Sequence, residues 1–218
     1  QLGDFEKLHS QWPMNTLVPL RRQTFEVNCN WKAFLDVFNE YYHLPFVHPN
    51  SVNAIYGFPE LSDTVSGEYA SQYGETDGSG GLLETQQEFA LPKMAGLDPL
   101  VEDGVRYTWV FPNMTFAAGS DALWIYEAMP ISPSRSRITQ TACFEQQTVM
   151  LENFDKIAEQ YYLRLDAAIA EDIPALENQQ AGLNSPFAKQ GRFSPNLEAN
   201  VANFANWYAT TMLEARKP

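Results

Sequence analysis

Cysteine and histidine are both scarce in this chain. Its 218 residues include 2 cysteines, Cys29 and Cys143, and 3 histidines. Two cysteines this far apart build neither a zinc knuckle nor a framework of disulfide bonds. We therefore expect both to be buried free thiols, which is the usual state of an unpaired cysteine.

Basic residues and long apolar runs are also few. The chain has 14 lysines and arginines against 27 acidic residues, a net charge of −13. Nucleic-acid binding needs basic patches, so we expect no nucleic acid as a partner. No apolar stretch approaches the roughly 18 residues of a membrane span, and no basic and apolar leader opens the sequence. From these absences we expect no membrane contact and a reduced, cytoplasmic setting.

Hydrophobic residues make up 44% of the chain, which is enough for a packed core. The length suits a single domain over residues 1–218. Residues 23–29 alternate in polarity as a strand does. From Asn30 the apolar residues recur every three or four positions, which predicts a helix of about three turns that Pro45 ends.

The middle of the chain is predicted to be antiparallel β, and its end is predicted to be helical. Five β segments are expected, and the first two form a hairpin around the turn ETDGSG. These segments cover residues 64–73, 81–90, 104–118, 121–129 and 135–144. A long helix is expected over 152–182, kinked or divided by Pro174, and a last helix over 195–214. This order of elements predicts an α+β fold with helices packed on one face of the sheet.

Two of the three histidines lie close together in the stretch EYYHLPFVHP, residues 40–49. Glu40 and His43 are three residues apart on the predicted helix, so both side chains can point the same way. His43 and His48 are five residues apart, which on a continuous helix turns them about 140° away from each other. They meet at one ion only if the helix ends between them, and Pro45 supplies that end.

A third ligand would come from a distant acid, and Asp172 is the strongest candidate. It lies on the otherwise apolar face of the long C-terminal helix, next to Pro174. An isolated carboxylate in a core is costly, so it needs a partner. Two histidines and one carboxylate suit iron and leave three octahedral positions open for oxygen and substrate. The spacing alone leaves open the alternative that Asp172 bonds a backbone group freed by Pro174.

The histidine motif is part of a longer resemblance. Residues 30–49, NWKAFLDVFNEYYHLPFVHP, closely resemble the signature of the catalytic domain in Rieske-type non-haem iron aromatic-ring-hydroxylating oxygenases. Residues 170–209 resemble the C-terminal region of the same family. This second stretch has an acidic pair, a Gln-x-Gly-Leu segment, a Gly-Arg-x-Ser turn and a last helix with an aromatic–Trp pair. The middle of the chain is similar only in its general β character.

The resemblance implies a helix-grip fold, in which a curved antiparallel sheet packs against long C-terminal helices. It also implies that His43, His48 and Asp172 bind a mononuclear Fe(II). Glu171 and Asp166 are weaker candidates for the carboxylate ligand.

Electron supply is also implied by the resemblance. Glu40 matches the acid that, in the family, links a histidine of a neighbouring subunit's Rieske cluster to the first iron histidine. The [2Fe–2S] cluster needs two cysteines and two histidines, and outside the iron motif the chain has only Cys29, Cys143 and His9. Residues 1–218 therefore resemble the catalytic domain alone, and the cluster belongs to a missing domain of the full-length protein. A reductase or ferredoxin would feed that cluster in a full-length homotrimer.

The reaction implied is an O2-dependent mono- or dioxygenation, by hydroxylation or oxidative demethylation. The substrate is an aromatic compound or a quaternary or methylated amine, and the acidic pair with its Gln-x-Gly-Leu stretch looks more like members that act on quaternary ammonium compounds. Candidate substrate-binding residues are Asp36, Val37, Leu44 and Asn113. Many family members carry Asn at position 36, where Asp36 either lines the pocket or is an exposed helix acid.

A non-catalytic alternative comes from a different class of protein. The helix-grip shape also serves as a carrier of small apolar ligands, and in that case His43 and His48 bind no metal. Iron content after loading discriminates between the two hypotheses.

Overall fold

One antiparallel sheet organises the protein, whose structure is a computed structural model that describes residues 1–49, 51–189 and 191–216. Within those residues, seven strands pair in the order β1-β7-β6-β5-β4-β3-β2. The strands are β1 (Leu17–Val27), β2 (Tyr56–Pro59), β3 (Tyr69–Thr76), β4 (Gly104–Val110), β5 (Met114–Ala118), β6 (Leu123–Ser132) and β7 (Arg135–Glu145). Strands β2 to β7 follow one another as a meander, and β1 lies at the far edge beside β7.

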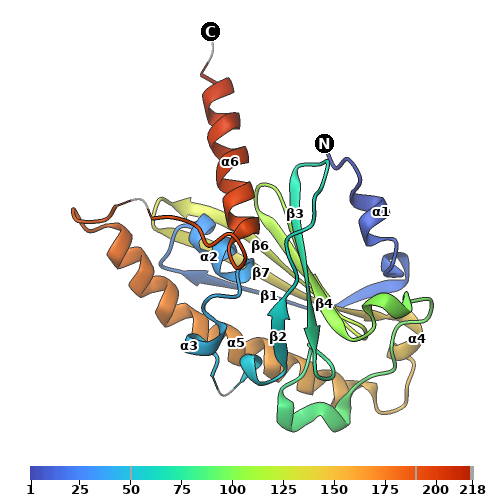
Figure 1. Cartoon of the computed structure of the whole chain (residues 1–218). Helices are drawn as coiled ribbons and strands as arrows, with labels where there is room; N and C mark the ends of the chain where they lie inside the picture. The colour runs from blue at the N-terminus through green and yellow to red at the C-terminus, as the bar shows by residue number, and fades with distance from the viewer. Residues whose placement is uncertain (50, 190, 217–218) are drawn as a thin grey trace.

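The helices lie mainly before and after the meander (Figure 1). They are α1 (Phe5–His9), α2 (Trp31–Phe38), α3 (Leu44–Val47), α4 (Gln146–Val149), α5 (Phe154–Leu183) and α6 (Ala199–Glu214). Short 3-10 turns occur at Met14–Thr16, Val52–Ala54, Glu84–Phe89 and Pro99–Val101. The predicted α+β helix-grip class is confirmed: a curved antiparallel sheet packs against helices that include the long α5.

The main core lies between one face of the sheet and the helices α2, α5 and α6. Leu35 of α2 and Leu165 of α5 are buried there against Trp124 of β6. Successive residues of a strand point to opposite faces, so Leu123 belongs instead to a second cluster on the other face, which also contains Trp12. The sheet is therefore covered on both sides, and the larger core holds the helices that carry the candidate site.

Two predictions of strands were wrong. The segment 81–90 is no strand and makes no hairpin, because β3 pairs with β2 and β4 instead. It contains the 3-10 turn Glu84–Phe89, and the side-chain amide of Gln87 holds this turn by accepting a hydrogen bond from the Ser79 N–H and donating one to the Ser79 carbonyl. The segment 104–118 forms two strands, since Pro112 cannot donate to a ladder and the chain turns there.

Other expectations concern the long helix, the thiols and the membrane. Pro174 lies inside α5 without dividing it. Cys29 and Cys143 are buried and free, as predicted. In the described part of the chain, no helix has both the length and the apolar character needed to cross a bilayer.

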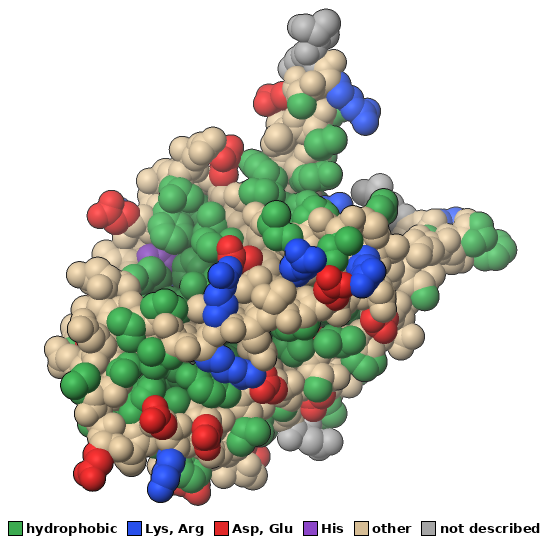
Figure 2. All heavy atoms as spheres, turned by 180° about the vertical axis from the view of Figure 1, so that it is seen from behind, with side chains coloured by type: hydrophobic (Ala, Val, Ile, Leu, Met, Phe, Trp, Pro, Cys, Tyr) green, Lys and Arg blue, Asp and Glu red, His purple; other side chains and the backbone are tan. Residues whose placement is uncertain are grey.

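The C-terminal helix projects from the body of the molecule (Figure 1). Figure 2 shows hydrophobic side chains in the open along this projecting helix. Leu213 near its end is 65% exposed, and Met212 is 43% exposed. Apolar surface of this kind is typical of a segment that contacts another polypeptide.

Candidate metal centre

The two histidines of the motif flank a single helical turn. Helix α2 begins after Asn30, whose side chain accepts a hydrogen bond from the Lys32 N–H at 3.0 Å, and it ends at Phe38. A new turn, α3, then begins after His43 and ends before His48. Pro45 lies in the first turn of α3, where its missing N–H costs no helical bond. The predicted helix from Asn30 to Pro45 was therefore wrong, because α2 ends at Phe38. The two histidines converge because a separate turn carries one at each end.

Asp172 of α5 meets both imidazoles. Its Oδ1 lies 3.0 Å from His48 Nε2 and 3.7 Å from His43 Nε2. One donor atom from each of the three residues lies within 4.8 Å of the others, and the two rings are at 5.1 Å between centroids with an interplanar angle of 74°. The structure thus brings together the three side chains that the sequence analysis selected as metal ligands.

A second carboxylate stands behind each imidazole. Glu40 Oε1 lies 2.5 Å from His43 Nδ1, and Glu171 Oε2 lies 2.6 Å from His48 Nδ1. Ser51 donates its hydroxyl hydrogen to the same Glu171 oxygen at 2.5 Å. An imidazole that donates Nδ1–H to a carboxylate keeps its Nε2 lone pair free for a metal, and the carboxylate raises its basicity. Both histidines therefore present Nε2 toward Asp172.

The residues fit a metal cation. Asp172 Oδ1 is buried and has no hydrogen-bond partner among the described residues. His48 is only 2% exposed. Its burial alone would lower the pKa of the His48 ring, but the carboxylates of Asp172 and Glu171 beside its two nitrogens outweigh burial and raise that pKa. A site that favours a proton between buried nitrogen and oxygen donors is one where a cation can replace the proton.

Two cavities adjoin the candidate metal centre. The first, the inner cavity, has a volume of about 50 Å³ and is lined in part by the rings of Tyr41, Tyr107, Trp124 and Tyr126. The second, the outer pocket, has a volume of about 340 Å³ and carries the carboxylates of Asp36, Glu40, Asp172 and Glu198. His43 and Asp172 line both. The candidate metal centre thus lies between a ring-lined chamber and an acidic opening.

The predicted substrate-binding residues are distributed unevenly. Val37 lines both cavities, Leu44 lines the inner cavity and Asp36 lines the outer pocket. Asn113 lies in the turn between β4 and β5, where its amide bonds the Ala128 carbonyl at 3.4 Å, and it lines neither cavity.

Asp36 has an unusual environment for a helix acid. Burial raises the pKa of its carboxyl to about 7, with Lys32 opposing the shift and Glu40 and Glu198 adding to it. The side chain is partly exposed. Of the two alternatives for this residue, the structure favours a place in the pocket wall over an exposed helix position.

The two weaker candidates for the carboxylate ligand have other partners. Asp166 pairs with Arg21 at 2.8 Å near the surface. Glu171 bonds the outer nitrogen of His48 and so supports a ligand instead of acting as one. Sequence reasoning missed this supporting role. The available signal was two adjacent acids on one helix, of which only Asp172 lies on the apolar face.

The fold and the site together define an α+β helix-grip protein with two histidines and one carboxylate converging in its interior. The chain belongs to the ring-hydroxylating alpha-subunit family, since the model of that family's catalytic domain matches residues 14–214.

Several known proteins are similar to the chain. It is 24% identical over 197 residues to the chloroplastic choline monooxygenase of Spinacia oleracea, and 23% identical over 195 residues to that of Amaranthus tricolor. These matches cover 88% of the chain but 40% of each relative, so the chain spans about two fifths of their length.

Solved structures share the fold. A quaternary ammonium Rieske monooxygenase in complex with its substrate gamma-butyrobetaine superposes with a TM-score of 0.67 at 23% identity, over 96% of this chain and 53% of that one. Naphthalene 1,2-dioxygenase from a Rhodococcus species gives 0.68 at 17% identity, over 93% and 57%.

Proposed function

We propose that this chain is the mononuclear-iron catalytic domain of a Rieske-type oxygenase. The observation that carries the proposal is the convergence of His43, His48 and Asp172, whose donor atoms lie within 4.8 Å of one another. Two imidazoles and one carboxylate with open positions are typical of non-haem Fe(II) oxygenases. The family's oxidoreductase character supports the same assignment.

Each residue of the centre has a distinct task. His43, His48 and Asp172 hold Fe(II), which when bound supplies the activation of O2. Glu40 and Glu171 hold the Nδ1 protons of the two histidines and fix the orientation of the rings. Val37 and Leu44, with the aromatic rings of the inner cavity, exclude water from the reacting carbon.

The substrate that the geometry favours is a methylated amine that undergoes monooxygenation at a methyl group. The outer pocket carries four carboxylates, which attract a cation, and it adjoins the inner cavity at His43 and Asp172. Choline monooxygenases are among the relatives of this chain, which supports an amine over an aromatic compound.

The electron source lies outside the chain in this proposal. Residues 1–218 form a single catalytic domain of a longer alpha subunit, whose Rieske [2Fe–2S] cluster receives electrons from a reductase or ferredoxin. Glu40 lines the acidic outer pocket and bonds His43, which supports its role as the link between a neighbouring subunit's cluster and the iron. A homotrimer supplies that neighbour, and the exposed apolar side chains of α6 support an assembly.

The cytoplasmic location stays a prediction, since the choline monooxygenases cited above are chloroplastic.

Metal analysis tests the proposal. We expect anaerobic loading with Fe(II) to give close to one iron per chain. His43→Ala and Asp172→Asn should each lose that iron, whereas Asp166→Asn, on the same helix but paired with Arg21 near the surface, should keep it. Peroxide with methylated amines should then drive product formation in the loaded chain, and the full-length protein with a reductase should do so with O2. Failure to retain iron after loading would contradict the proposal.

The carrier alternative is disfavoured by the inner cavity. A carrier of small apolar ligands needs an apolar wall, yet buried polar atoms of Asp172 and Arg164 border this cavity without a hydrogen-bond partner among the described residues. The carrier hypothesis predicts that His43→Ala leaves ligand binding intact.

A further inference from the structure

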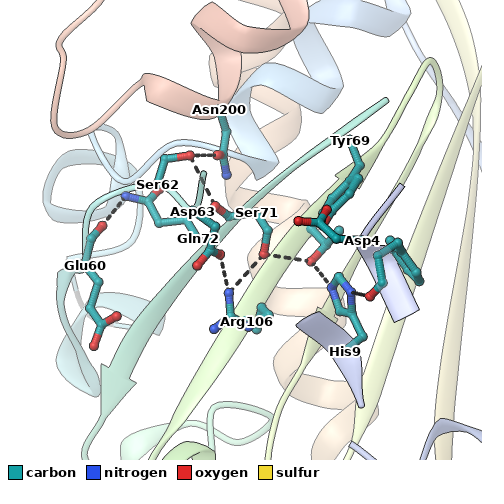
Figure 3. Close-up of polar contacts among 12 residues, drawn as sticks. Asp4, His9, Glu60, Ser62, Asp63, Tyr69, Ser71, Gln72, Arg106 and Asn200 are labelled. Atoms are coloured by element: carbon teal, nitrogen blue, oxygen red, sulfur yellow. Dashed lines mark hydrogen bonds and ion pairs between the residues drawn. The ribbon is translucent and has the colours of Figure 1, made fainter. Parts of the chain in front are cut away.

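Two arginines are buried among the described residues, and they differ in their partners. Arg106 is 7% exposed and lies over the rings of Trp12 and Tyr73. Its guanidinium pairs with Asp63 and also donates to Ser71 at 3.2 Å (Figure 3). A buried cation needs such a carboxylate, because its desolvation is otherwise uncompensated.

Arg164 of α5 has no such carboxylate. It is 4% exposed and lies 4.9 Å from the ring centroid of Trp124. Its one hydrogen bond within the described residues goes to the Tyr56 hydroxyl at 3.2 Å, and it makes no ion pair there. The Tyr56 hydroxyl also accepts a hydrogen bond from the Tyr107 hydroxyl and donates one to the Gly80 carbonyl. It therefore has no further hydrogen-bonding capacity for the guanidinium. The guanidinium charge is therefore buried without an anionic partner.

Unpartnered polar atoms gather at the inner cavity. Ten buried side-chain nitrogen or oxygen atoms of the described residues have no hydrogen-bond partner, and four of them belong to residues that line this one cavity. One is the candidate metal ligand, Asp172 Oδ1. The other three are Arg164 Nε, Trp124 Nε1 and Tyr41 Oη, all of which can donate. Each such atom costs free energy until an acceptor reaches it.

We propose that Arg164 is a specificity-determining residue that binds the carboxylate of the substrate, with Trp124 and Tyr41 as further donors. Taken with the proposed function, on which this inference rests, the substrate is a methylated amino acid and not an amino alcohol. A carboxylate is the acceptor that matches the fork of a guanidinium. The inner cavity, at about 50 Å³, holds roughly four water-sized groups, which suits a carboxylate and the carbon that bears it.

The positions of the charged groups agree with such a substrate. Arg164 and Asp172 are eight residues apart on α5, a rise of about 12 Å, and both border the inner cavity. A substrate held at Arg164 extends toward His43 and Asp172, where the inner cavity meets the acidic outer pocket. Its anionic end thus faces the buried cation, and its cationic end faces the carboxylates.

Binding to the iron-loaded chain tests the inference, with two matched pairs of ligands. Glycine betaine and choline share a trimethylammonium group and differ in carboxylate against hydroxymethyl. Benzoate and benzyl alcohol make the same comparison without the amine. Calorimetric titration should show glycine betaine binding about tenfold or more tightly than choline. Arg164→Met should abolish that preference and leave the Kd of choline within about twofold. Arg164→Lys, which keeps the charge but not the fork, should retain part of it.

Controls separate recognition from folding. Thermal unfolding and iron content show whether each variant keeps its structure. If Arg164→Met does not fold, Tyr41→Phe keeps the ring, removes only the unpartnered hydroxyl, and should weaken glycine betaine several-fold while sparing choline.

The two ligand pairs keep this inference apart from the proposed function. Suppose that neither amine binds, so that the assignment of an amine substrate fails. The inference that Arg164 binds a carboxylate would still be supported if benzoate bound more tightly than benzyl alcohol and Arg164→Met lost this preference. Absence of a carboxylate preference in both pairs, or equal losses for both members of a pair in the Arg164 variants, would overturn the inference.

Discussion

Glu171 Oε2 lies 2.6 Å from Nδ1 of His48, although the two residues are 123 positions apart in the sequence. Glu171 is the immediate neighbour of Asp172, which approaches the opposite nitrogen of the same ring at 3.0 Å. Two consecutive residues of α5 thus bracket one imidazole, one at each nitrogen. A small rotation of α5 about its axis would disturb both contacts. The two contacts therefore fix the orientation of α5 relative to the turn that carries the histidines.

Glu171→Gln tests the support behind His48. The amide removes the negative charge that makes the ring a better donor, so we expect iron affinity to fall by about tenfold while the fold is preserved. Competition with a chelator measures the change. Glu159→Gln, at an exposed position of the same helix, is the matched control and should leave the affinity unchanged. Equal affinities in the two variants would show that Glu171 does not act on the metal.

The local part of the candidate site could be predicted from the sequence. Glu40, His43 and His48 lie within one short segment, and backbone geometry alone limits where their side chains can point. Asp172 was found because a lone acid on an apolar helix face needs a partner. The overall α+β class followed from the alternation of β and helical periods.

The rest depended on contacts between distant segments. The pairing of Glu171 with His48 requires the docking of α5 onto α3, which no local pattern encodes. Arg164 reads in the sequence as an ordinary helix arginine, and only the packing of β6 and α5 buries it over Trp124. The segment around Glu84–Phe89 follows a turn sequence that suits a hairpin, but both sides of β3, its predicted partner, are occupied by β2 and β4.

Glu40→Gln should separate electron delivery from iron binding. The amide still accepts the Nδ1–H hydrogen bond of His43, so iron affinity should fall by no more than the roughly tenfold expected for Glu171→Gln, and loading with excess Fe(II) should still fill the site. In the full-length protein with its reductase, we expect O2-dependent turnover to fall by about 100-fold, since the charged link to the neighbouring cluster is lost. Peroxide-driven turnover needs no such link and should stay within about tenfold of wild type. A parallel loss of both activities would instead assign Glu40 to the iron site alone.

The buried His9 should lower the free energy of unfolding as the pH falls into the acid range. Its ring is buried in a polar network, where Nδ1 contacts the Phe5 carbonyl and Nε2 the Thr108 hydroxyl, both at 2.8 Å (Figure 3). Burial lowers the pKa of His9 from 6.5 to about 4, and nearby Arg106 adds to the shift. Protonation therefore favours the unfolded chain. The stability of the neutral ring is fully present above pH 6.5 and is lost as the pH falls toward 4, a total of about 3 kcal/mol.

Urea unfolding at several pH values measures this dependence. His9→Gln cannot titrate, so the difference in unfolding free energy between wild type and variant should shrink as the pH falls from 7 to 4. Other titrating groups are common to both proteins and cancel in that difference. A difference that stays constant over this range would mean that His9 is solvated in the folded protein.

The carboxyl of Asp36 should lower the stability of the folded protein as the pH rises through neutral values, whereas His9 lowers it as the pH falls. Its pKa in the folded protein is about 7, above the ordinary value of 3.8, chiefly because of burial. The folded state therefore holds this proton more tightly than the unfolded chain does. Stability from the protonated carboxyl is complete below pH 3.8 and disappears as the pH rises through 7.

Asp36→Asn removes the charged form, so the variant should be more stable than wild type at pH 8 and similar at pH 4. Because the side chain is partly exposed in the outer pocket, we expect a gain of about 2 kcal/mol and not the full value of the shift. Chemical denaturation of the two proteins at pH 4 and pH 8 measures it, with Glu159→Gln as the control for removing an exposed helix acid. A stability difference that is the same at both pH values would show that folding does not raise the pKa of Asp36.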